Sequence, residues 1–175
     1  MSSALSSSIL KARIDLMLDQ PYLSSAVARY PLVDAPGYEW CPTLATDGYN
    51  VFANSDFCKT LNTDEAVFVF AHEIIHCMFG HIDRRKDRVP LLWNYAIDYA
   101  TNLMLKDFGL KMPEIGLIDE RYRHMTAEQI YDSLVSSENK AKEDSRGSRI
   151  PCSSLTEEEP FDLHLEPTDS RAQAL

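Results

Sequence analysis

The chain has 175 residues, 45% of them hydrophobic, and carries a formal net charge of −10. This length supports one domain with a hydrophobic core and is too short for two comfortable ones. The acidic balance argues against nucleic-acid binding, which needs a basic surface, and no uncharged run approaches the length of a membrane span.

The N-terminal part of the chain is predicted to form two helices followed by a loop. Apolar residues at helical spacing predict a helix over residues 4–19, which ends before Gln20-Pro21 because the residue before a proline avoids the helical region. A second short helix is expected over residues 23–29. Two prolines and a glycine within residues 31–37 then predict a loop.

Residues 43–54 carry the strongest hairpin signal. Asp47-Gly48 lies between two short strand-like runs, which is typical of a tight turn that requires positive φ. Two interpretations stay open for this hairpin. Its edge strand could pair with the extended backbone of a peptide substrate, or the hairpin could simply close a small sheet over the helix that follows.

The next helix is predicted to contain a metal-binding motif. The run before the motif has neither proline nor glycine, Asn62 or Thr63 is the expected N-cap, and Gly80 offers a left-handed stop. Within the helix the sequence reads His72-Glu73-x-x-His76. Because residues four apart share one helical face, both rings can point a nitrogen at one metal ion.

Glu73 lies one step round the helix, where its carboxylate can reach a metal-activated water. This arrangement predicts a zinc site with Glu73 as the catalytic base, which takes a proton from the water and returns it to the leaving amine. The alternative is a buried helix whose histidines are satisfied by hydrogen bonds.

The segment after the motif is basic and is followed by another helix. Residues 84–88 are predicted to be a solvated loop, or else a contact for a substrate carboxylate or a partner. A helix should begin at Pro90 and stop at Gly109. Its Asn94, Asp98 and Asn102 form a polar stripe without long charged side chains, and we expect this stripe to face the metal rather than solvent.

A catalytic zinc keeps three protein ligands, and two residues compete for the third position. Asp98, which follows His76 by 22 residues, would supply a carboxylate from the second helix. His81 lies about 140° round the helix from His76 and could return to the site only if the chain reverses at Gly80. Whichever residue does not bind the metal is expected to hold a ligand or a water.

A capping box that begins at Thr126 predicts a last helix ending near Leu134. Beyond it Ser, Glu, Lys and Asp dominate, so the chain divides into a domain of residues 1–135 and an acidic linker or disordered tail of residues 136–175. Within the tail, residues 161–165 are a candidate docking segment. The tail as a whole is a candidate contact for a protein partner.

Several segments together resemble a poorly characterised family of bacterial and phage metallopeptidase-like proteins that precede a von Willebrand factor A-like domain. The resemblance is carried by residues 45–48, 54–57, 72–76 with Gly80-His81, Arg84, 93–102 and 125–131. It implies a zincin-like fold and a metal site that uses His72 and His76, with His81 and Asp98 at the other conspicuous positions. Residues 136–175 resemble the linker that would precede the A-like domain.

We therefore expect an α+β protein: a mainly helical, zincin-like metallopeptidase domain with a small β-hairpin or sheet beside the motif helix. The predicted function is hydrolysis of a peptide or protein substrate with Zn²⁺ as cofactor. The alternative is a catalytically silent binding or assembly module, associated with phage or with defence. No signal peptide opens the chain and its four cysteines form no Cys-x-x-Cys pair, so we expect a cytoplasmic, reduced protein that contacts neither nucleic acid nor membrane.

Overall fold

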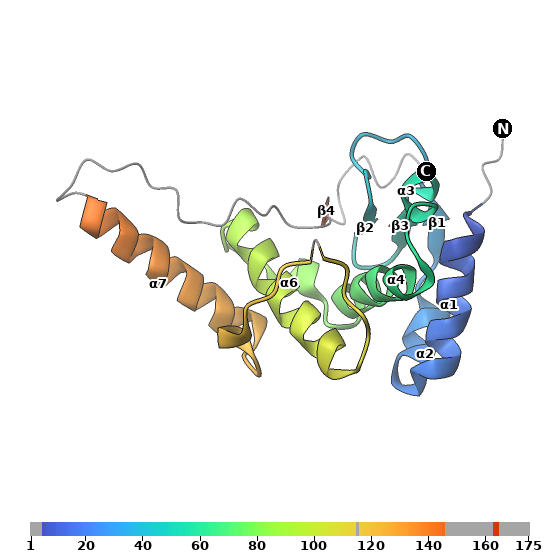
Figure 1. Ribbon diagram of the computed structural model, residues 1–175. Coiled ribbons are helices and arrows are strands. Elements are labelled where there is room, and N and C mark those ends of the chain that lie inside the picture. Colours follow the sequence, from blue (N-terminus) through green and yellow to red (C-terminus); the bar gives the residue numbers. More distant parts are fainter. Residues whose placement is uncertain (1–4, 115, 146–162, 165–175) are drawn as a thin grey trace.

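A computed structural model describes residues 5–114, 116–145 and 163–164 (Figure 1). Helices dominate and a small sheet lies beside them, which confirms the predicted α+β class. The elements in chain order are α1 (Ser7–Asp19), α2 (Pro21–Arg29), β1 (Leu32–Asp34), β2 (Leu44–Thr46), β3 (Val51–Ala53), α3 (Ser55–Cys58), α4 (Thr63–Met78), α5 (His81–Arg84), α6 (Pro90–Asp107), the 3₁₀ turn η1 (Glu120–Tyr122), α7 (Ala127–Ser145) and β4 (Leu163–His164).

Helix α4 lies at the centre of the arrangement (Figure 1). Helices α1 and α2 pack on one side of it and α6 packs on the other, with α7 beyond α6, while the sheet contacts α4 through β2. The buried apolar side chains form one core around α1, α2 and α4, a second around α6 and α7, and a small third cluster at the sheet. The facing surfaces of α4 and α6 therefore meet between two hydrophobic cores. Among the described residues, no helix combines the length and apolar character needed to cross a membrane.

The predicted hairpin is present as the antiparallel pair β2 and β3. Its turn forms because the Asp47 carboxylate accepts hydrogen bonds from the backbone N–H groups of Tyr49 and Asn50, at 2.8 and 2.7 Å. Gly48 has a φ of 88°, the left-handed conformation that the Asp-Gly pair predicted.

The sheet is larger than the hairpin, with strand order β1-β3-β2-β4. The prediction of a loop over residues 31–37 was wrong in part, because Leu32–Asp34 form strand β1 parallel to β3. On the other side, β4 runs parallel to β2, with Leu163 opposite Ala45. Since β2 has a neighbour on each side, the structure favours the interpretation in which the hairpin closes a sheet over α4.

Helix ends follow the local signals. Asn62 caps α4 in a capping box with Glu65, and Gly80 ends the helix region with a φ of 59°. The capping box of α7 is formed by Thr126 and Gln129. The predicted end of α7 near Leu134 was wrong, because the following residues up to Ser145 contain neither proline nor glycine and continue the helix.

The predicted tail falls mostly outside the described residues. Residues 136–145 belong to α7, and residues 146–162 and 165–175 are not described. Of the candidate docking segment, residues 163–164 are described as β4.

Candidate metal centre

His72, His76 and Asp98 meet between α4 and α6. Their three candidate ligand atoms all lie within 4.8 Å of one another. The two histidine Nε2 atoms are 2.7 Å apart, and each lies 3.6 Å from Oδ1 of Asp98. The structure thus brings together two neighbours on one face of α4 and a carboxylate from the helix packed against it.

This donor set fits a zinc ion. Zn–N and Zn–O bonds of about 2.0–2.2 Å separate tetrahedral ligand atoms by about 3.4 Å. The histidine–aspartate distances of 3.6 Å are close to that value, and the 2.7 Å between the histidines would have to widen slightly. Two imidazoles and one carboxylate are also ligands that zinc accepts, and three protein ligands are the number found in catalytic zinc sites.

Asn102 fixes which nitrogen of His72 faces Asp98. The amide nitrogen of Asn102 donates a hydrogen bond to the backbone carbonyl of Leu117 at 2.8 Å, so its oxygen must face His72. That Oδ1 lies 2.9 Å from Nδ1 of His72, which therefore carries the proton and donates. The lone pair of His72 is left on Nε2, the atom nearest Asp98, as a metal ligand requires.

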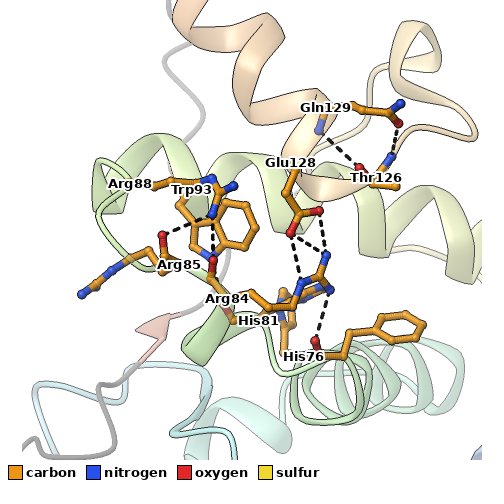
Figure 2. A network of polar contacts seen from close by, with 10 residues as sticks. His76, His81, Arg84, Arg85, Arg88, Trp93, Thr126, Glu128 and Gln129 are labelled. Atoms are coloured by element: carbon orange, nitrogen blue, oxygen red, sulfur yellow. Dashed lines mark hydrogen bonds and ion pairs between the residues drawn. The ribbon is translucent and has the colours of Figure 1, made fainter.

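His81 lies on the opposite side of the His76 ring from Asp98. Its Nδ1 is 2.9 Å from Nδ1 of His76, whereas Nε2 of His76 faces His72 and Asp98. The left-handed Gly80 turns the chain so that α5 carries His81 back toward α4. Trp93 of α6 holds it there, because the indole N–H donates to the backbone carbonyl of His81 at 2.8 Å (Figure 2).

The cluster is buried. His72, His76 and Asp98 are exposed by 2%, 0% and 1%, and Glu73, next to His72 on α4, by 0%. Burial removes the competing solvent and strengthens electrostatic interactions among these groups. Of the predicted polar stripe, Asp98 and Asn102 are buried and lie against the two histidines, whereas Asn94 is only partly buried.

Two arginines of the basic segment 84–88, which begins at the last residue of α5, are tied to the rest of the fold. Arg84 makes a two-pronged ion pair with Glu128 of α7, with N–O distances of 2.7–3.1 Å (Figure 2). Arg88 lies over the rings of Trp93 and Tyr131, 4.8 and 5.5 Å from their centres. The prediction of a solvated loop was therefore wrong for these two arginines.

Burial raises the pKa of Glu128, but the hydrogen bonds from Arg84, a backbone hydrogen bond and the positive charges of Arg84 and Arg88 together outweigh it, so the net shift is downward from 4.5. The pair is ionised near neutral pH. It joins α5, which carries His81, to α7.

Burial also raises the pKa of the described cysteines: Cys77 to about 11, and Cys41 and Cys58 to about 12. Next to His76, the Cys77 sulfur lies 2.9 Å from the Thr46 hydroxyl of β2. These thiols stay protonated near neutral pH, so they act as packing residues rather than as nucleophiles.

Sequence reasoning missed two contributors to this region. The Leu117 carbonyl that orients Asn102 comes from the connection between α6 and α7, and a backbone atom leaves no sequence signal. Thr101, fully buried on α6, was also missed. The only available signal was a hydroxyl residue one turn after Asp98.

A group of two histidines from a His-Glu-x-x-His helix and an aspartate from the neighbouring helix is typical of metallopeptidases. The chain belongs to the protein family described as "Putative metallopeptidase domain", whose match extends over residues 5–170. Comparisons with curated proteins and with solved structures give no match.

Proposed function

We propose that this protein is a zinc-dependent peptidase in which His72, His76 and Asp98 hold the ion. The observation that carries the proposal is the convergence of three buried donor atoms, with the His72 tautomer set by Asn102 so that Nε2 is available. A bound zinc ion would supply Lewis acidity, lowering the pKa of a water molecule and polarising the scissile carbonyl.

The residues of the chain then have separate tasks. Glu73 takes the proton of the attacking water and delivers it to the leaving amine, so that the amine departs neutral. Asn102 keeps the Nδ1 proton on His72. For His76 to offer Nε2, its Nδ1 must donate to Nδ1 of His81, so His81 acts as a proton acceptor that orients His76 rather than as a ligand.

One observation favours the second candidate, a binding or assembly module with a structural metal. The four central residues are at most 2% exposed, which suits a closed structural site. The three-ligand donor set and the adjacent Glu73 favour the peptidase, because structural zinc sites normally have four protein ligands and need no general base.

The deciding experiment compares Glu73→Gln with the wild-type chain, both purified with zinc. We expect equal zinc content by elemental analysis and loss of peptide hydrolysis, measured by mass spectrometry on a peptide library, in the variant alone. Glu114→Gln, at an exposed position, is the matched control and should behave as wild type. Full hydrolysis by Glu73→Gln, or none by the wild-type chain, would reject the peptidase.

Three further proposals concern the substrate, the location in the cell and the partner of this protein. We propose a peptide or protein substrate, a cytoplasmic location, and a protein partner for the acidic segment of residues 136–175. Cross-linking in cells with and without that segment tests the last of these.

A further inference from the structure

A cavity of about 320 Å³ lies beside the metal cluster, between α5, α6 and the start of α7. Its volume falls at the lower end of the range for small-ligand sites. Phe79, Met104 and Met125 supply most of its large apolar side chains. Methionine is flexible and polarisable, so two of them make a wall that adapts to apolar groups of different shape.

Two residues that line the cavity also neighbour the metal cluster. His81 forms part of its wall, and the His81 ring is 4.9 Å from the His76 ring between centres. Thr101 also lines it and follows Asp98 by one turn of α6, so the two side chains lie on neighbouring parts of one helix face. A group in this cavity would therefore lie close to the proposed zinc ligands.

The cavity offers little charge to a ligand. Its one arginine, Arg84, already pairs with Glu128 through two nitrogens, so its charge is compensated. Of the two lining histidines, His124 is exposed, and His81 is buried with its Nδ1 2.9 Å from Nδ1 of His76. Deeper in the wall, the Thr101 hydroxyl is fully buried and has no hydrogen-bond partner within the described part of the chain. A buried hydroxyl without a partner is costly, and a ligand N–H or C=O would satisfy it.

We propose that this cavity binds an uncharged apolar side chain of the substrate, such as leucine, methionine or phenylalanine, and so directs cleavage to bonds near such residues. The inference rests on the proposed peptidase function. Thr101 supplies the hydrogen-bonding group that receives the backbone of the bound residue, and the flexible methionines close around its side chain. Lysine and glutamate side chains are disfavoured because the one arginine among the described lining residues is already paired with Glu128, and a buried charge without a partner is costly.

The first test uses the zinc-loaded, full-length protein labelled with ¹³C at the methionine methyl groups. N-acetyl-leucine amide and N-acetyl-phenylalanine amide, at millimolar concentration, should shift the resonances of Met104 and Met125. Met17 on α1 and Met112 serve as internal controls and should not move. No shift, or equal shifts with N-acetyl-lysine amide and N-acetyl-glutamate amide, would overturn the proposal.

A filling variant tests the location. Ala100 lines the cavity, so Ala100→Leu should partly fill it. The concentration of N-acetyl-leucine amide that half-shifts the Met104 resonance should then rise at least tenfold. Ala28→Leu places the same change at an exposed site on α2 and should leave the response unchanged. An unchanged Met17 resonance shows that each variant is folded. An undiminished Met104 response in folded Ala100→Leu would place the binding site elsewhere.

Cleavage of a peptide library separates this inference from the peptidase proposal. Wild-type products should be enriched in apolar residues at one position near the cleaved bond, and Ala100→Leu should shift that position toward smaller residues. Hydrolysis without such a preference would overturn the cavity's role and leave the peptidase intact. Absence of hydrolysis would reject the peptidase and with it the substrate role of the cavity, even if the methyl resonances respond to the probes.

Discussion

Oδ1 of Asn102 lies 2.9 Å from Nδ1 of His72, and the Asn102 amide nitrogen is committed to the Leu117 carbonyl. The side chain can therefore present only an acceptor to the histidine. A partner of this kind sets both the tautomer and the orientation of the ring. Replacing Asn102 should therefore weaken zinc binding more than it destabilises the fold.

Asn102→Leu should lower zinc affinity by about 10–100-fold, the usual effect of removing a partner of a metal-bound histidine. Asn102→Asp keeps an acceptor and should retain more of the affinity. Competition with a chromogenic chelator measures both. Asn94→Leu, on the same helix two turns earlier, is the control and should bind zinc as wild type does. Unchanged affinity in Asn102→Leu would show that the tautomer is set in another way.

Asp98→Asn and His81→Phe should differ in degree. If Asp98 is the third ligand, its replacement should cost more zinc affinity than the roughly 10–100-fold expected for His81, which orients the His76 ring. X-ray absorption at the zinc edge should then find two imidazoles in the wild-type site. A third imidazole, or the reverse order of affinities, would assign the ligand position to His81.

The Arg84–Glu128 pair should contribute about 0.5–1 kcal/mol to folding, since both side chains are only partly buried. A double-mutant cycle with Arg84→Ala and Glu128→Gln, followed by urea unfolding, measures this coupling. The folded-state pKa of Glu128 lies below its usual value of 4.5, so the coupling is present above 4.5 and is lost as pH falls through the folded-state pKa. A coupling that grows on acidification would contradict the assignment.

Cys41, Cys58 and Cys77 should resist Ellman's reagent in the native protein at about pH 8, because they are buried and their pKa values lie near 11–12. The measurement is best made with Cys152→Ser, so that only these three thiols are followed. All three should react at once in denaturant. Rapid labelling of one thiol in the folded chain would show that its surroundings open readily.

Helix caps and turns, which depend on a few neighbouring residues, were predicted correctly from the sequence. The cap at Asn62, the turn at Gly48 and the stop at Gly80 all depend on preferences of the residue itself or of its near neighbours. Strand β1 could not be predicted this way. Its residues 32–34 lie between prolines, and they become a strand only because β3 supplies backbone partners for them.

The same distinction holds at the site. Helical spacing alone placed His72 and His76 on one face, whereas the choice between Asp98 and His81 depends on how α6 and α5 pack against α4. The spacing of the polar stripe predicted which face of α6 carries Asp98 and Asn102. It could not show that Asn102 would be oriented by a backbone carbonyl of a separate segment.

Strand β4 pairs with β2 although residues 47–162 separate the two strands in the sequence. Closing so long a loop is slow, so this pairing should form after the hairpin and the helices. During synthesis the hairpin leaves the ribosome long before residues 163–164, and its outer backbone groups then have no strand beside them. Unpaired strand edges recruit other chains. We therefore expect the nascent chain to be most prone to aggregate, and most dependent on chaperones, in the interval before β4 is made.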